Sequence, residues 1–246
     1  MKLLPVTWLE SIDSTNSYIK RKLERGDTLP SGTVISARTQ TAGRGRNSRI
    51  WNQAPGQDIA VSIYLNLSQE PASLLPLPLV IGLATRQTVE NLGICANVKW
   101  PNDLLVSGRK ISGVLMENVP ARAPGSHIII GIGLNVNMPQ ADSQRIDKPA
   151  TSLAIELGHQ LDMPQVLEQL LGSVEFYLGE FLRDGFTKLR ENWLTATADL
   201  GAPVAVETPG GRIVGSIASV GKSGELIIKN PAGELVEIWA GDVTRL

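Results

Sequence analysis

The chain is poor in the residue types that carry thiol and metal chemistry. It has one cysteine and two histidines in 246 residues, which excludes an internal disulfide and a cysteine-rich zinc site. His127 and His159 lie in no metal-ligand spacing. Cys95 stands in an apolar run and is expected to be a small buried hydrophobic residue. The chemistry of this chain must therefore rest on other residue types.

The sequence also lacks a strong net charge and a long apolar segment. The formal net charge is −1, which argues against broad electrostatic binding to DNA. The longest apolar runs, such as residues 128–136, are too short to span a bilayer. No signal peptide is expected, because Glu10 and Asp13 follow the N-terminus too closely. We expect a soluble, cytoplasmic protein with no membrane or DNA partner.

What the chain does have is a stretch rich in arginine and glycine, Gly43–Trp51. Arginine presents a planar fork of donors that matches phosphate and carboxylate oxygens, and glycine lets the backbone approach a ligand closely. Such clusters are also common in solvated loops and nucleic-acid tails. Here, however, the stretch follows a strand-like run at residues 32–37 and ends in Ile50-Trp51, so both ends are tethered to the core. The pattern favours a loop that closes over an anion.

This loop is not one of the common nucleotide-binding motifs. The spacing Gly43-x-Gly45-x-x-Ser48 lacks the third glycine of a dinucleotide fingerprint, and a strand pattern follows it where a helix would be needed. No glycine is followed at the required spacing by Gly-Lys-Ser or Gly-Lys-Thr. A nucleotide would have to be held in another way.

The hydrophobic pattern indicates a large α+β domain followed by a small β domain. A helix over residues 17–25 is preceded by Asp13-Ser14-Thr15-Asn16 and followed by Gly26. The remaining expected elements are strands at 33–37 and 60–67, a helix at 76–92, strands at 94–100, 111–117 and 127–136, and helix from 149 to about 192. From residue 199, short strands and tight turns indicate a small β-barrel. We therefore divide the chain into residues 1–198 and 199–246.

Two further segments place charged residues beside a turn or beside a glycine in a strand. Lys99-Trp100-Pro101-Asn102-Asp103 fits an ordinary β-turn, but its lysine and aspartate bracket the turn with opposite charges that could neutralise phosphate or hold Mg²⁺. Lys110 begins the next strand, where a lysine is usually just solvated; Gly113 weakens a strand unless something approaches it closely. Residues 131–137 also have glycines within an expected strand, here two of them, followed by the polar residue Asn135.

Five segments in order, DSTN, QTAGRGR, KWPNDLL, RKISGVLME and GIGLNVN, resemble the biotin–protein ligases, also called biotin–[acetyl-CoA-carboxylase] ligases. The resemblance is dense over residues 10–140 and looser beyond. It implies that biotin and ATP form biotinyl-5′-AMP and pyrophosphate, and that a lysine of a biotin carboxyl carrier protein then displaces AMP. ATP and biotin are thus expected as substrates, with Mg²⁺ and unidentified metal ligands. No catalytic triad is needed, because biotin's own carboxylate attacks in the first step.

The resemblance also implies roles for individual residues. Lys110 would be an electrostatic catalyst between biotin's carboxylate and the α-phosphate, and Arg44 would cover the reacting groups. Trp51 and Trp100 would offer apolar or stacking surface. The residues expected to bind biotin are Ser14, Thr15, Asn16, Gln40, Gly43, Arg44, Gly45, Arg46, Lys110 and Gly113. Those expected to bind ATP or the adenylate are Arg46, Arg49, Trp51, Lys99, Asn102, Asp103 and Asn135.

The implied fold is an α+β catalytic domain like the class II aminoacyl-tRNA synthetase core with a mixed sheet, followed by an SH3-like barrel. Some relatives carry an N-terminal DNA-binding domain, which is expected to be absent here because DSTN begins at residue 13. Some relatives dimerise, so a homodimer is allowed. Asn47-Ser48 replaces a further Arg-Gly that many members carry, which lowers the charge of the loop. Residues 138–148 are expected to form a second loop over the adenosine.

Two alternatives remain open at this point. A lipoyl or octanoyl ligase shares the core fold and the adenylation chemistry, but those families resemble a different loop with a run of glycines and a nearby histidine, which residues 40–51 lack. A nucleic-acid-binding module would use the arginine loop and the barrel. It would need a basic domain and aromatic platforms, whereas the chain has three Phe and three Tyr.

Overall fold

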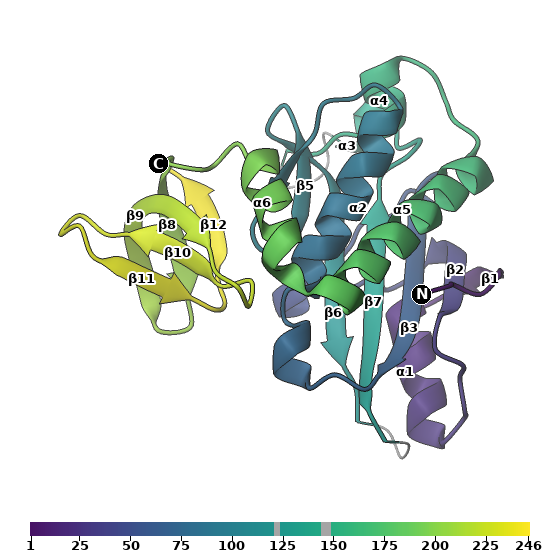
Figure 1. Ribbon diagram of the computed structural model, residues 1–246. Coiled ribbons are helices and arrows are strands. Elements are labelled where there is room, and N and C mark those ends of the chain that lie inside the picture. Colours follow the sequence, from purple (N-terminus) through teal and green to yellow (C-terminus); the bar gives the residue numbers. More distant parts are fainter. Residues whose placement is uncertain (121–123, 144–148) are drawn as a thin grey trace.

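The computed structural model describes residues 1–120, 124–143 and 149–246. A seven-stranded mixed sheet forms the larger part, in the order β1-β2-β3-β7-β6-β5-β4, and a five-stranded antiparallel sheet follows it (Figure 1). The strands of the large sheet are β1 (Val6–Ile12), β2 (Thr33–Gln40), β3 (Ile59–Leu67), β4 (Asn97–Lys99), β5 (Asp103–Val106), β6 (Arg109–Asn118) and β7 (Ser126–Leu134).

Helices cover both faces of this sheet. α1 (Thr15–Arg25) lies on one face, and α2 (Leu77–Asn91), α5 (Met163–Asp184) and α6 (Phe186–Ala196) lie on the other (Figure 1). The central strands β3 and β7 are therefore almost wholly buried, which explains their continuous apolar sequences. The short elements are η1 (Arg46–Ser48), η2 (Pro71–Leu74), α3 (Gln140–Ser143) and α4 (Leu153–Leu157).

The start of α1 matches its expected capping signals. The Ser14 side chain accepts a hydrogen bond from the backbone N–H of Ser17, and Gly26 ends the helix with φ at 90°. Ile19 and Leu23, on the inner side of the helix, pack with Ile35, Tyr64 and Ile129 of the sheet. The helix is thus fixed at the cap and along its length, with its N-terminus directed at the middle of the sheet.

Several sequence-based expectations about the elements were wrong. The strand β1 was missed, and β5 and β6 form a hairpin whose Ser107-Gly108 turn was not anticipated. Residues 149–192 are not helical throughout: α4, α5 and α6 are separate helices. Cys95 is exposed, because the apolar run around it falls in the turn between α2 and β4 and not in a strand.

The helical stretch Pro71–Asn91, which contains η2 and α2, is long and apolar enough to cross a membrane by length and composition. In this structure 67% of its apolar window is buried, and α2 packs between the sheet and α5. Its apolar composition is therefore accounted for by the core, as for many central helices of globular proteins.

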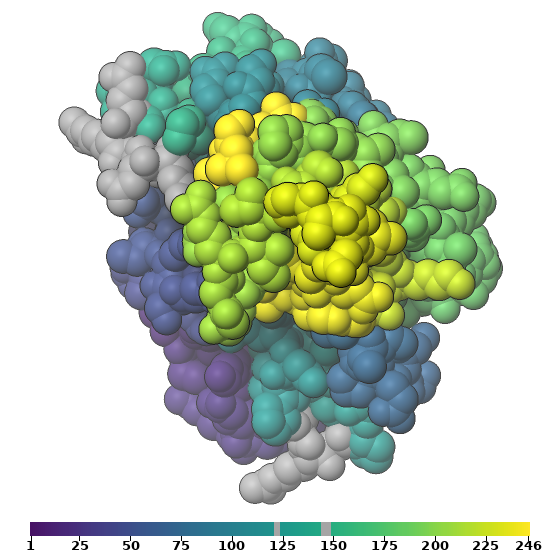
Figure 2. All heavy atoms as spheres, turned by 90° about the vertical axis from the view of Figure 1, so that its left-hand side faces the viewer, coloured from purple at the N-terminus to yellow at the C-terminus, as the bar shows by residue number. Residues whose placement is uncertain are grey.

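The second sheet has the order β11-β10-β9-β8-β12. Its strands are β8 (Pro203–Thr208), β9 (Gly211–Val220), β10 (Leu226–Lys229), β11 (Leu235–Ile238) and β12 (Asp242–Arg245). Figure 2 looks onto this sheet, which covers the centre of that side of the molecule. It is held to the large sheet by the Trp100 indole N–H, which donates to the Gly224 carbonyl at 3.0 Å. Arg190 of α6 donates to the Val220 carbonyl at 2.5 Å.

Candidate active site

Small residues line one face of the large sheet where β3, β7 and β6 lie side by side. Ser62 pairs with Gly131, Ala60 pairs with Gly133, and Gly133 also pairs with Gly113. Because side chains alternate along strands, all five lie on the face that carries α1. A Cβ at Gly131 would come within 2.5 Å of the Asn16 Oδ1, and one at Gly133 within 2.3 Å of the Trp51 ring. The glycines therefore form a trough into which the Asn16 and Trp51 side chains fit.

One end of this trough, which we call the head end, is a network of buried polar side chains. Gln40 Oε1 accepts from the Thr15 backbone N–H at 2.8 Å and from the Thr15 hydroxyl at 3.1 Å. The Ser62 hydroxyl lies 2.7 Å from the Thr15 hydroxyl and 2.5 Å from the Asn16 Oδ1. Thr15, Asn16 and Ser62 are each at most 3% exposed. The structure thus brings three of the residues expected to bind biotin, Thr15, Asn16 and Gln40, to one place.

Glu117 and Arg44 extend this network to the arginine loop. The Asn16 amide donates to Glu117 Oε2 at 2.9 Å, and Arg44 Nη2 lies 3.0 Å from Glu117 Oε1. Arg44 Nη1 also donates to the Ser17 hydroxyl at 3.3 Å. Glu117 is seven positions along β6 from Lys110, which places their Cα atoms roughly 23 Å apart. The expected grouping of Arg44 with Lys110 at the reacting atoms is therefore not what this conformation presents.

Lys110 lies at the opposite end of the trough, which we call the phosphate end. Its ammonium is 2.5 Å from Asp103 Oδ1 and 5.8 Å from the centre of the Trp51 ring. A Cβ at Gly113 would be 3.1 Å from this ammonium, so the lysine folds back over its own strand. The Lys110 backbone is fixed to the segment that begins at Pro149, since the Lys110 N–H donates to the Pro149 carbonyl at 2.8 Å.

Two more arginines of the loop approach the phosphate end and the second sheet. Arg46 donates to Asn102 Oδ1 at 3.3 Å and to the Gly241 carbonyl at 3.2 Å. Its guanidinium is 3.7 Å from Asp242 at the start of β12, and Arg49 holds the same carboxylate through both of its terminal nitrogens. Burial lowers the pKa of Arg46, whereas the Asp242 carboxylate raises the pKa of Arg49. Asp242 therefore supplies the negative charge that these arginines meet in the absence of a ligand.

The arginine loop itself is a closed turn. Arg44 and Ile50 form an isolated antiparallel bridge, the Gly45 N–H donates to the Arg49 carbonyl at 2.8 Å, and the Trp51 N–H donates to the Gly43 carbonyl at 3.0 Å. At its tip Asn47 and Ser48 both adopt left-handed backbone, with φ at 53° and 59°. Asparagine tolerates that region better than serine does. Ser48 thus occupies a conformation that suits glycine, the residue that many members of the resembled family have there.

The two tryptophans have different positions. The Trp51 ring lies on Gly113 and Gly133, and its buried Nε1 has no hydrogen-bond partner among the described residues. A buried N–H without an acceptor at a trough is suited to a ligand oxygen. Trp100 was expected to offer surface beside it, which is wrong: Trp100 is 3% exposed and is occupied by its bond to Gly224.

Lys99 and Asn135 are the other two residues expected on the nucleotide side. Lys99 is half-buried and is the cross-strand partner of Asp103, so these two residues do bracket the turn. Asn135 is 4% exposed, and its amide donates to the Thr151 carbonyl at 2.9 Å. It supports the backbone beside Lys110 in this conformation, and its contact with adenosine remains a prediction. Of the second expected loop, residues 138–143 include the helix α3, and residues 144–148 lie outside the described residues.

Sequence reasoning missed three residues of this region: Ser62, Glu117 and Asp58. Ser62 had a signal, since it is a polar residue in an otherwise apolar strand, and Glu117 ends one of the quoted motifs. Asp58 is fully buried and accepts the backbone N–H groups of Ala54 and Val136, both at 2.9 Å. Burial raises its pKa to about 6 against these hydrogen bonds. It joins the stem after Trp51 to the end of β7.

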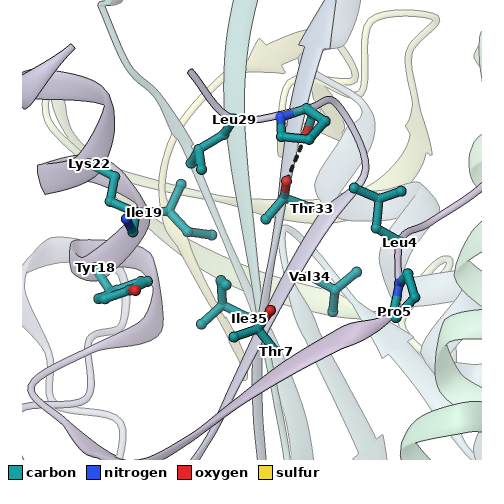
Figure 3. Close-up of a pocket in the computed structure, with 11 residues that line it drawn as sticks. Leu4, Pro5, Thr7, Tyr18, Ile19, Lys22, Leu29, Thr33, Val34 and Ile35 are labelled. Atoms are coloured by element: carbon teal, nitrogen blue, oxygen red, sulfur yellow. Dashed lines mark hydrogen bonds between the residues drawn. The ribbon is translucent and has the colours of Figure 1, made fainter. Parts of the chain in front are cut away.

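No group of three or more His, Cys, Asp or Glu side chains that could hold a metal ion occurs in the described ranges. A cavity of about 350 Å³ lies elsewhere, between α1 and the strands β1 and β2 (Figure 3). Its lining is mainly apolar, with Tyr18, Ile19 and Lys22 on one side and Val34 and Ile35 on the other. None of the residues expected to bind biotin or ATP lines it, so the trough and not this cavity is the candidate active site.

Comparison with known proteins identifies the family of this chain. The family model described as "Biotin/lipoate A/B protein ligase family" matches residues 8–135. The chain belongs to this family. It is 30% identical to the biotin–[acetyl-CoA-carboxylase] ligase of Paracoccus denitrificans, with 93% of this chain and 95% of that protein covered. Against the bifunctional ligase/repressor BirA of Bacillus subtilis it is 31% identical over 88% of this chain and 67% of that protein.

A solved biotin protein ligase from Aquifex aeolicus in complex with biotin and ATP superposes with a TM-score of 0.82 at 30% identity, with 98% of each chain covered. Both the family and the mixed α+β fold expected from the five motifs are thus confirmed. As a member of this family, the chain is a ligase, and its Paracoccus denitrificans and Aquifex aeolicus relatives are biotin ligases.

Proposed function

We propose that this ligase activates biotin with ATP as biotinyl-5′-AMP and transfers biotin to a lysine of a biotin carboxyl carrier protein. The observation that carries the proposal is the trough of Ala60, Ser62, Gly113, Gly131 and Gly133, with an amide-and-hydroxyl network at one end and Lys110 at the other. A bicyclic ureido ring suits the head end, which offers both donors and acceptors. A carboxylate suits the cationic phosphate end.

In the first step the biotin carboxylate attacks the α-phosphorus of ATP, and pyrophosphate leaves. Both reactants are anions, so their repulsion must be offset where they meet. Lys110 lies where a carboxylate at the end of the trough would be, and Arg46 stands with Asn102 beside it. Asp103 pairs with Lys110 until a substrate anion replaces it as partner. Mg²⁺ would be held by the phosphates and by Asp103, the carboxylate beside Lys110.

In the second step the uncharged amine of the carrier lysine attacks the carbonyl carbon of the mixed anhydride. An amide forms, its nitrogen releases one proton to solvent, the bond to the phosphate oxygen breaks, and AMP leaves with its charge stabilised by the same cations. The chain need supply no nucleophile, because the amine of the carrier lysine attacks the anhydride directly. The half-buried Trp51 indole, whose N–H has no partner among the described residues, would cover the trough and keep water from the anhydride.

The finer architecture belongs to the same proposal. Residues 1–198 would form a catalytic domain like the class II aminoacyl-tRNA synthetase core, and residues 199–246 an SH3-like domain that assists ATP use or carrier docking. The contacts of Arg46 and Arg49 with Gly241 and Asp242 support such an assisting role. A homodimer through the edge of the large sheet and a cytoplasmic location are also part of the proposal.

The decisive experiment is ATP–pyrophosphate exchange with biotin or lipoate as the acid. We expect exchange with biotin only. Incubation with biotin, ATP, Mg²⁺ and a carrier domain should then add one biotin mass to the carrier in a mass spectrum. Exchange that depends on lipoate would move the chain to the lipoyl ligases, and exchange with neither acid would refute the proposal.

A further inference from the structure

Glu117 contacts both the head-end network and the arginine loop. Its Oε2 accepts from the Asn16 amide, and its Oε1 faces Arg44 at 3.0 Å. The Glu117 side chain is 17% exposed, whereas the Arg44 side chain is 43% exposed. The carboxylate is thus part of the trough wall, and the guanidinium is the movable partner that closes on it.

Arg44 contacts residues on two sides of the head end. Besides Glu117 on β6, Arg44 donates to Ser17 in the first turn of α1. The guanidinium therefore bridges the two elements that border the head end, α1 and β6. The position conflicts with a role at the reacting carboxylate and phosphate, since Lys110 lies at the opposite end of the same strand.

We propose that Glu117 is a positioning residue that latches Arg44 over the head end, so that this ion pair governs how long biotin is retained and does not take part in the chemical step. The inference rests on the proposed biotin-ligase function. Two features support a retention role: the same carboxylate orients Asn16 of the head-end network, and its partner Arg44 belongs to the arginine loop. A partly buried ion pair with shared hydrogen bonds is sensitive to loss of one charge.

The test is a double-mutant cycle of Glu117→Gln and Arg44→Met, read by biotin dissociation and by steady-state ATP–pyrophosphate exchange. Glutamine keeps an acceptor for Asn16 but removes the charge that faces Arg44. We expect each single variant to speed biotin dissociation and raise the KM for biotin about tenfold, with kcat within twofold of the parent. The double variant should also be about tenfold impaired and not a hundredfold, because both changes remove the same contact. Arg44→Lys should restore part of the retention.

A matched control is the exposed ion pair Arg38–Glu10, whose side chains are 55% and 86% exposed. The variants Arg38→Met and Glu10→Gln should leave biotin KM and dissociation unchanged. A tenfold loss of kcat in Glu117→Gln at an unchanged biotin KM, or multiplicative effects in the double variant, would overturn the proposal.

A ligand-free measurement separates this inference from the proposed function. Hydrogen exchange of the amides in residues 41–51 should accelerate severalfold in both Glu117→Gln and Arg44→Met, whatever the substrate is, because the latch is closed without ligand. Unchanged exchange in this segment would overturn the latch even in an active biotin ligase. Accelerated exchange in a protein that shows no biotin-dependent ATP–pyrophosphate exchange would leave the latch standing as a contact and refute the ligase function.

Discussion

The Lys110 ammonium lies 2.5 Å from Asp103 Oδ1, across the β5–β6 hairpin. Both residues face the trough, at strand positions that meet through Gly113, the backbone partner of Asp103. The aspartate holds the lysine at the phosphate end before any substrate is present. A substrate carboxylate or phosphate that enters would find this cation already in place and would take over the position of the Asp103 carboxylate.

Replacement of Lys110 by alanine should slow adenylate formation by about 10²–10³-fold, as expected for the loss of one preorganised charge contact. Biotin should still bind measurably, because the head-end network does not include Lys110. The measurement is single-turnover formation of biotinyl-5′-AMP at saturating biotin. The exposed Lys188→Ala on α6 serves as the control and should match the parent. Adenylate formation by Lys110→Ala at the parental rate would reduce Lys110 to a solvated lysine.

Replacement of Gly133 by alanine should displace Trp51 from the trough. The added Cβ would lie 2.3 Å from the ring, and overpacking of this kind costs about 1–3 kcal/mol. We expect biotin affinity to fall about 5- to 150-fold, measured by titration calorimetry, with a change in the intrinsic fluorescence of Trp51. Gly172→Ala is the control, because a Cβ on this glycine of α5 would meet no atom within 4 Å. Equal biotin affinity of the two variants would contradict the assignment of the trough.

Removal of the Asp242 charge should loosen the arginine loop from the second sheet. Asp242→Asn takes away the ion partner of Arg49 and of Arg46. Ion pairs this exposed contribute only about 0–1 kcal/mol, so the melting temperature should change little. Trypsin should nevertheless cut after Arg46 or Arg49 severalfold faster, and biotin with ATP should protect both proteins. The control is Asp27→Asn, which removes an exposed ion pair with Lys22 and should be cut by trypsin at the parental rate. Cleavage of Asp242→Asn at the parental rate would mean that other contacts hold the loop.

The buried Asp58 should make stability depend on pH in a defined window. Its pKa is about 6 in the folded protein against an ordinary value of 3.8, so the folded state binds the proton more tightly than the unfolded state does. The stabilising contribution of protonated Asp58 is complete below about pH 3.8, falls as the pH rises through 6, and is absent above that. A shift of this size corresponds to roughly 3 kcal/mol.

Urea unfolding of the parent and of Asp58→Asn between pH 4 and 7.5 measures this contribution. The difference in unfolding free energy between the two proteins should change through the window and level off above pH 6.5. An amide in place of a carboxylate also presents a donor to the Ala54 or Val136 N–H, so the variant should be the less stable protein throughout. Parallel pH profiles would show that Asp58 does not titrate near pH 6.

Restoring Arg-Gly at residues 47–48 should strengthen adenylate retention. Ser48 has a φ of 59°, which glycine adopts without the steric cost that serine carries. Asn47→Arg adds a cation at the tip of the loop. The double variant should release biotinyl-5′-AMP severalfold more slowly than the parent, as measured by chase with excess biotin, and Ser48→Gly alone should give the backbone part of the effect. Release at the parental rate would mean that the tip does not reach the adenylate.

The family could be read from the chain, because each of the five motifs is a run of neighbouring residues. Five short motifs predicted the ligase family, and the capping pattern around Ser14 indicated α1, which begins at Thr15, two residues before the expected start. The strands of the core were also largely predictable, since β3 and β7 carry the continuous apolar runs that burial on both faces requires. The hairpin of β5 and β6 was missed, although the dipeptide Ser107-Gly108 is a turn signal in the sequence.

What the sequence determined by itself was local: helix caps, buried strands, and the residue types that suit biotin, phosphate and carboxylate. What only the tertiary structure decided were the partners of those residues. Strand register placed Ser62, Gly131 and Gly133 into one trough, and the approach of the second sheet gave Arg46 and Arg49 a common partner in Asp242. Glu117 forms an ion pair with Arg44, which is 73 positions away in the sequence. Such pairings depend on the packing of distant segments, and no periodicity along the chain records which charges that packing brings together.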